Sequence, residues 1–567
     1  MPEDFNKIIL APGERIVKEI VPAGALPNRP GYAMLEKKNG AGVMKKLLKV
    51  LVVCLAAVML LSGGGLLGML GWDREMVAFS DMEYVRPELT EYRALLEECC
   101  TLAEAGEDLD ALENAILDFF AVYNSYYTNF SLADIHYCCD TSDIYWTDEY
   151  NYCMETSSEV DAGLDQLYYT LADSVFREEL ESEDFFGAGF FDDYEGDSLW
   201  DETFTALMEE ESALVTQYYD LSAQLYGTGH LAAQEQLCTL YVQLVRLRQE
   251  IAQYAGYEDY AHFAYDFYYA RDYAPEQEAE YLRDVQEELV PIYQYLAENG
   301  VEGAYYYECT EEETFEYVRG LSRSIGGVVE EAFDWMAEAE LYDIAYSENK
   351  YEASFEVFLT DYYVPFVFMN PEGINYDKLT FAHEFGHFCN DFASYGTMVG
   401  IDVAEVFSQG MEYLSLIYGD AEELEKLSMY SSLCVQVEQS AYASFEQQVY
   451  ALEGEELTEE SVIGAFRSAM ADFGLDIWGM EDLYFTTVPH FFTNPLYVFS
   501  YVVSNDAAMQ IYQMELAESG AGLQVYLDNL TTEECCFLGF VESAGMESPF
   551  AEGRLSELAQ TYEDALK

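Results

Sequence analysis

The sequence predicts a mainly α protein with little β structure. Apolar residues recur at three- and four-residue steps through most of the chain after residue 72, which is the spacing of one helix face. A single stretch is dominated by β-branched and aromatic residues, as in a strand. With 567 residues, of which 51% are hydrophobic and 16% aromatic, the chain is long enough for several domains and can bury a large core, which excludes wholesale disorder.

The first 71 residues differ in charge from the rest of the chain. Residues 1–49 hold nine basic and five acidic side chains, whereas the remaining chain holds 16 basic and 102 acidic ones. Between these regions, Val50–Gly71 is an uncharged run of 22 residues, long enough for one transmembrane helix whose basic flank stays in the cytoplasm. Read from Met44 as the true start, the same run also resembles a cleaved secretory signal. Both interpretations export the acidic part, either anchored in the cell membrane or secreted.

The net charge of −82 narrows the range of partners. A nucleic-acid binder is excluded because a phosphate backbone requires a basic surface. A strongly negative field can attract cationic peptides, although the charge favours a solubility role that is unrelated to specificity. The eleven cysteines after residue 71 follow no metal-ligand or disulfide-scaffold spacing, so we expect buried thiols, and the sequence does not determine any pairing.

Local signals bound several elements in chain order. A helix is predicted from Pro275 to Asn299, with a kink at Pro291. Another is predicted to begin after the cap residue Thr458 and to end at Gly474.

The extended stretch is Val364–Asn370, in which Pro365 restricts a strand to a sheet edge or to the beginning of the strand. As an edge strand it can offer backbone groups to an extended peptide, or it can merely support the element that follows. After a turn at 371–373, a helix is predicted to begin near Asp377, a residue suited to capping it.

That helix carries the most informative residues, His383-Glu384-Phe385-Gly386-His387. Histidines four apart project from one helix face and can bind a single zinc ion, while the glutamate beside them can act on an attacking water. A catalytic zinc needs a third protein ligand, and Glu405 and Glu412 share a face of the next predicted helix, over residues 402–412. One can bind the metal while the other orients a ligand histidine, and spacing alone does not choose between them.

These motifs together resemble the oligoendopeptidase F and thimet oligopeptidase family of zinc metallopeptidases, which are gluzincins. The resemblance rests on the histidine motif and on four further stretches: Ala404–Ser408, Met411–Glu412, Pro365–Asn370 and Pro489–Tyr497. Arg248–Tyr273 also looks like the family's segment before its catalytic part. The likeness covers roughly residues 200–560, and more weakly 85–200.

The resemblance implies a two-lobed helical metallopeptidase with a deep substrate channel and a small β-sheet beside the histidine helix. It places an N-terminal helical lobe at 72–200 and a zinc metallopeptidase catalytic domain at 201–567, after the tail 1–49 and the anchor or signal 50–71. It implies Glu405 as the third zinc ligand, because the family's metal glutamate precedes a serine, here Ser408. It also implies that His490, Tyr497 and Tyr501 stabilise the oxyanion of the scissile peptide.

The expected activity is therefore zinc-dependent endopeptidase cleavage of short oligopeptides outside the cell, with one Zn²⁺ ion and with Glu384 as the general base. The alternative is an exported, catalytically inactive peptide-binding protein on the same scaffold. Glu384 favours the enzyme, because a binder has no need of a general base.

Overall fold

The computed structural model describes residues 76–566 except 183–184, 195–198, 200, 223–224, 226–229, 352, 421 and 533. The predicted tail 1–49 and the uncharged run Val50–Gly71 lie outside the described residues. Within the described part, every helix is too short or too polar to cross a membrane.

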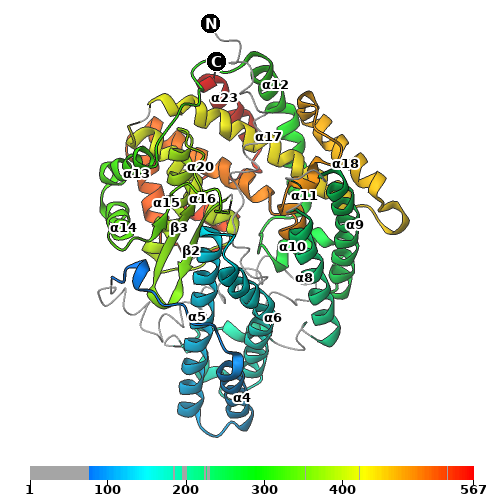
Figure 1. Ribbon diagram of the computed structural model, residues 1–567, viewed down its shortest axis with the longest axis vertical. Helices are drawn as coiled ribbons and strands as arrows, with labels where there is room; N and C mark the ends of the chain where they lie inside the picture. The colour runs from blue at the N-terminus through cyan, green and yellow to red at the C-terminus, as the bar shows by residue number, and fades with distance from the viewer. Residues whose placement is uncertain are drawn as a thin grey trace.

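The described chain is mainly helical, which confirms the predicted fold class (Figure 1). The helices before the sheet are α4 (Leu89–Ala105), α5 (Leu109–Cys139), α6 (Ile144–Ala172), α7 (Arg177–Leu180), α8 (Glu202–Ser222), α9 (His230–Tyr254), α10 (Tyr260–Phe267), α11 (Pro275–Glu288), α12 (Val290–Asn299), α13 (Glu311–Ile325) and α14 (Gly327–Glu338). The helices after it are α15 (Asp377–Ser394), α16 (Ile401–Tyr418), α17 (Glu425–Tyr450), α18 (Glu459–Asp472), α19 (His490–Thr493), α20 (Phe499–Ala517), α21 (Ala521–Asn529), α22 (Phe537–Ser543) and α23 (Arg554–Leu566). The strands are β1 (Tyr342–Asp343), β2 (Ser354–Leu359) and β3 (Val364–Met369).

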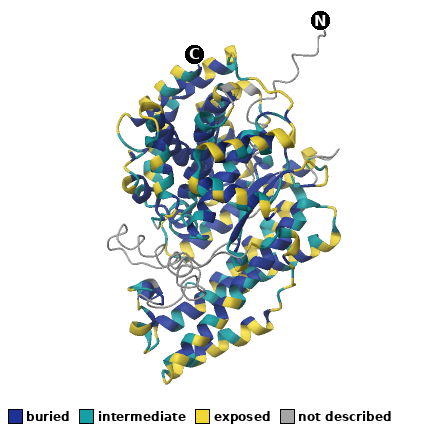
Figure 2. Ribbon diagram, turned by 90° about the vertical axis from the view of Figure 1, so that its left-hand side faces the viewer, coloured by how far each residue is buried: buried dark blue, intermediate teal, exposed yellow. Residues whose placement is uncertain are grey.

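Two separate hydrophobic cores divide the molecule into lobes. Helices α4, α5 and α6 form a bundle that projects from the body in Figure 1, and aromatic residues such as Phe119 and Phe186 fill its core. A much larger core occupies the rest of the described chain, and Figure 2 shows its buried residues gathered in the centre of the body. The upper end of α5 reaches β2, so the two lobes meet beside the sheet.

The sheet has the strand order β1-β3-β2, which makes β3 its central strand. Of the two alternatives that Pro365 left open for Val364–Asn370, an edge strand or the beginning of a strand, the structure has the second, because Pro365 is the second residue of the central strand. The sheet edge beside the cavity is β2. Pro365 is tolerated because it sits opposite Phe358 in the antiparallel pair. The bond from the Asn370 amide to the Ala353 carbonyl sets the alternation of the ladder, so the Pro365–Phe358 pair exchanges no hydrogen bonds. On the other side of β3, β1 pairs only from Val367 onward.

The predicted helix boundaries hold with two refinements. The helix from Pro275 is interrupted at Leu289, two residues before Pro291, and continues as α12. Helix α18 is capped by Thr458, whose hydroxyl accepts the Ser461 amide, as expected. Helix α15 begins at Asp377, but this carboxylate does not cap it. It accepts instead the amides of the preceding turn, residues 372–374, at 2.8–3.0 Å.

Candidate active site

Helices α15 and α16 cross at very short range because Gly386 lies at their contact. A Cβ atom at position 386 would lie 2.5 Å from the Phe407 carbonyl oxygen and 2.7 Å from the Ser408 Cα atom. Only a residue without a side chain fits there, and the crossing directs His383 and His387 of one helix at Glu405 of the other. The glycine inside the histidine motif is therefore part of how the site is built.

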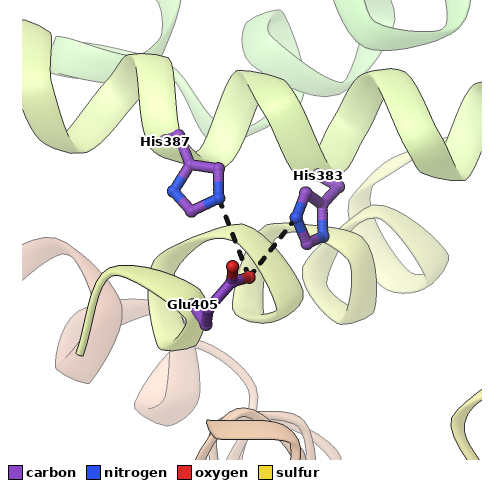
Figure 3. A group of neighbouring side chains, drawn as sticks. All are labelled: His383, His387 and Glu405. Carbon is purple, nitrogen blue, oxygen red and sulfur yellow. Dashed lines mark ion pairs between the residues drawn. The ribbon is translucent and has the colours of Figure 1, made fainter. Parts of the chain in front are cut away.

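The three side chains converge as a metal site requires (Figure 3). Glu405 Oε2 lies 3.5 Å from His383 Nε2 and 3.8 Å from His387 Nε2, and all three donor atoms lie within 4.8 Å of one another. Zinc bonds of about 2.0–2.1 Å at tetrahedral angles place neighbouring ligand atoms roughly 3.3 Å apart. Two imidazoles and one carboxylate are also a ligand set that catalytic zinc sites use, so these residues fit a zinc ion.

Glu412 occupies the orienting position rather than the third ligand position. Its Oε1 atom lies 2.7 Å from His383 Nδ1, the ring nitrogen that faces away from Glu405. A carboxylate on that nitrogen fixes the tautomer and the orientation of a ligand histidine. The Glu405 carboxylate is held in turn, with Ser408 Oγ 3.0 Å from its Oε2 atom and the Tyr497 hydroxyl donating to its Oε1 atom at 3.0 Å.

The charged groups at this site shift one another's pKa. Burial opposes a charge on the His383 imidazole, but the hydrogen bond to Glu412 and the surrounding carboxylates outweigh it and raise its pKa to about 9. Burial and repulsion from Glu405 and Glu412 raise the pKa of Glu384 to about 8, and burial also raises the pKa of Glu405. Burial and the charge of His383 lower the pKa of His387. A divalent cation would offset the repulsion among these three carboxylates.

The other predicted residues gather on the opposite side of the site. Tyr497 and Tyr501 line the same cavity as the histidines, and their ring centroids are 5.2 Å apart. His490 stacks on Tyr497 at 5.3 Å and lies 6.0 Å from the Tyr501 ring. Burial lowers the His490 pKa to about 4, so this imidazole is neutral near pH 7. Among the described residues, neither His490 Nε2 nor the Tyr501 hydroxyl has a close hydrogen-bond partner, although the Tyr501 hydroxyl interacts with the side chain of Tyr497.

A cavity of about 380 Å³ contains the metal-site residues and runs between the lobes. Its walls come from α5, β2, α15, α16, α17 and α20. Beyond the catalytic group, the lining residues include Asp134, Glu356 and Asp391, whereas no lysine or arginine lines the described cavity. The described lining of the cavity is therefore rich in acidic side chains.

Sequence reasoning missed the wall formed by β2. Residues 354–358 all line the cavity, and the alternation of Phe355 and Val357 with Ser354 and Glu356 is a strand signal that the sequence does contain. It also missed the close approach at Gly386, which no spacing rule reveals. The predicted residues His383, His387, Glu405, Tyr497 and Tyr501 do come together in space.

Comparisons with known protein sequences give one family match. Residues 79–198 match the family model of the Peptidase M3 N-terminal domain. No curated protein sequence matches the chain.

Solved structures with the same fold cover most of the chain. A structure described as an oligoendopeptidase F from Bacillus anthracis is 21% identical, with a TM-score of 0.72, over 87% of this chain and 98% of the other. PZ peptidase A with an inhibitor is 19% identical, with a TM-score of 0.75, over 86% and 99%. A further structure described as oligoendopeptidase F is 20% identical, with a TM-score of 0.75, over 86% and 98%. The fold and the family match confirm the resemblance to oligoendopeptidase F-like metallopeptidases.

Proposed function

We propose that this oligoendopeptidase F-like metallopeptidase is a zinc-dependent endopeptidase that hydrolyses short, extended peptides. The observation that carries the proposal is the convergence of His383, His387 and Glu405 at the wall of an acidic cavity, with Glu384 beside them. One zinc ion held by these three residues would polarise the scissile carbonyl and acidify a water molecule.

Glu384 is proposed as the general base. Its side chain is buried at the cavity wall, and burial with two neighbouring carboxylates gives it an unusually high proton affinity, with a pKa of about 8. A zinc ion bound beside this group would favour its ionised form, which is the form that accepts the proton of an attacking water. The same group then returns the proton to the departing amine.

Tyr501 and His490 are proposed to stabilise the oxyanion. Both carry a buried polar atom without a close hydrogen-bond partner in the described structure, so both are available to donate to the former carbonyl oxygen. Tyr497 is already engaged with Glu405, which favours a role in holding that ligand as well as in lining the site.

The substrate backbone is proposed to pair with β2. This strand is the sheet edge, and the hydrogen-bond alternation with β3 directs the backbone groups of Ser354, Glu356 and Phe358 away from β3. These residues line the cavity, so an extended peptide can add to the sheet there. This proposal replaces the one made from the sequence for Val364–Asn370.

A peptide-library digest tests the proposed activity. The purified wild type, loaded with one equivalent of zinc, is incubated with a diverse set of short peptides and the products are identified by mass spectrometry, with a chelator control. Glu384→Gln should lower turnover by about 10³-fold or more while retaining zinc, because the base is lost but no ligand is. The exposed Glu338→Gln variant on α14 provides the matched control and should retain full activity.

Failure of the zinc-loaded wild type to cleave any peptide would contradict the proposal. Peptide binding without cleavage would then favour the inactive peptide-binding protein.

We also propose an extracytoplasmic location, on the strength of the charge change around the uncharged run Val50–Gly71. If the catalytic domain is exported and anchored, a protease added to intact cells should cleave it from the cell surface. Recovery of all activity in the cytosolic fraction would contradict this proposal.

A further inference from the structure

The segment from Pro489 to Tyr501, which carries His490 and both tyrosines, has little regular structure of its own. It contains only the four-residue α19 before α20 begins at Phe499. Leu496 adopts a left-handed backbone conformation with φ of 65°, which is costly for a residue other than glycine. Such a segment needs external contacts to hold its side chains in one place.

Those contacts come from two arginines buried in the body. Arg248 of α9 donates to the carbonyl oxygens of Phe491 and Phe492 and forms an ion pair with Glu211 at 2.7 Å. Arg271, in the loop after α10, donates to the Leu496 carbonyl at 3.1 Å. Both arginine side chains are fully buried, so every charge-assisted bond that they make acts without competition from water.

Of these two arginines, Arg271 is the one that contacts both sides of the site. Its second amino group donates to Ser500 Oγ at 2.9 Å, one residue before Tyr501. Its Nε atom lies 3.3 Å from the carboxylate of Asp402, in the first turn of α16 and three residues before Glu405. The guanidinium therefore connects the start of the ligand helix to the segment that carries the proposed oxyanion donors.

The orientation of this guanidinium is itself fixed. It lies over the rings of Tyr265 and Tyr269, with 4.4 and 4.7 Å to their centroids. Tyr269 also donates to the Pro495 carbonyl at 2.7 Å, and Tyr273 donates to Asp402 at 2.7 Å. A planar guanidinium held in this way donates hydrogen bonds in fixed directions, whereas the ammonium group of a lysine is flexible and does not.

We infer that Arg271 is a positioning residue that sets the distance between the metal ligand Glu405 and the donor Tyr501. The inference rests on the function proposed above and identifies a residue that controls it from outside the cavity, since Arg271 does not line it. The Tyr497 hydroxyl on Glu405 forms a second link between the two sides.

A shift of the donor segment should affect the transition state more than the bound substrate, because the oxyanion forms only during reaction. A misplacement of about 1 Å can cost about 10²-fold in rate. Arg271→Lys is therefore expected to lower kcat by about 30- to 100-fold and to change KM by no more than about twofold.

The matched control is Arg554→Lys. Arg554 is also a buried arginine, 2% exposed, paired with Asp506 at 2.9 Å, but it makes no hydrogen bond to the segment from Pro489 to Tyr501. Both variants should lose thermal stability to a similar extent, and both should still bind one zinc ion when titrated against a competing chelator. Only Arg271→Lys should lose kcat.

A double mutant separates positioning from a general loss of structure. If Arg271 acts through the donor, Arg271→Lys should add little to the loss already caused by Tyr501→Phe. The inference would be overturned if the fold-losses in kcat of the two single variants multiplied in the double mutant, or if the Arg271 and Arg554 variants had equal kcat. In either case an active wild type would still uphold the proposed function. A zinc-loaded wild type without peptide cleavage would instead overturn the proposed function, and the inference with it.

Discussion

The two sides of the site are built in different ways. The metal side comes from two helices, in which His383 and His387 are one turn apart and Glu405 follows 18 residues later. The other side, here called the donor side, is the irregular segment from Pro489 to Tyr501 with the proposed oxyanion donors. Its backbone carbonyls accept hydrogen bonds from Arg248 and Arg271, more than 220 positions earlier in the chain. On the metal side, the helical repeat alone is sufficient to bring the two histidines together. The donor side takes its shape only when distant parts of the chain have packed against it.

The largest expected effect separates the two acidic candidates on the metal side. Glu405→Ala should abolish stoichiometric zinc binding and with it all activity, because a ligand atom is removed. Glu412→Ala should retain one zinc ion with about 10- to 100-fold weaker affinity, because only the orientation of His383 is lost. Zinc content after dialysis and chelator competition measure both. Loss of zinc in the Glu412 variant alone would reverse the assignment.

The donor side should show the next largest effect. Tyr501→Phe removes the buried hydroxyl of a residue that lines the cavity and should lower kcat by about 10²- to 10³-fold with unchanged zinc affinity. Tyr497→Phe should lower zinc affinity by about tenfold, because its hydroxyl binds Glu405. Steady-state kinetics together with zinc titration distinguish the two. The same pattern in both variants would argue that the tyrosines have one shared role.

The close helix crossing on the metal side predicts a stability effect. Gly386→Ala places a methyl group against the backbone of residues 407 and 408 and should cost about 1–3 kcal/mol, seen as a lower Tm. Gly320→Ala on the exposed face of α13 is the matched control, since its added methyl meets nothing within 4 Å. That variant should be unchanged or stabilised by about 0.5–1 kcal/mol. An unchanged Tm for Gly386→Ala would remove the packing argument.

The smallest expected effect is on substrate preference, through the negative charge that surrounds both sides of the site. The net charge of −82 and the acidic cavity wall should favour peptides that carry lysine over matched peptides that carry glutamate. We expect about a tenfold difference in kcat/KM at low salt and near equality at about 1 M salt, where screening acts within ~3 Å. A glutamine-containing peptide serves as the neutral control. A preference that salt does not change would indicate direct contacts rather than steering.

Much of the fold was predictable because its signals are local. The break before Pro291, the cap at Thr458 and the start of α15 at Asp377 each depend on a few neighbouring residues. The sheet order was not predictable, because a proline in a strand is compatible with an edge or with the first residues of a central strand. The choice depended on β1, which pairs with β3 only beyond Pro365.

By itself, the sequence determined that two imidazoles share one helix face with a glutamate next to them, because helical periodicity converts a four-residue spacing into proximity. It left open whether Glu405 or Glu412 lies between the two imidazoles, since seven residues apart they lie on the same side of α16. Tertiary structure decided this through the crossing at Gly386, which brings Glu405 to both histidines and leaves Glu412 on the far nitrogen of His383. Distances between separate helices arise from packing, and no spacing within one helix encodes them.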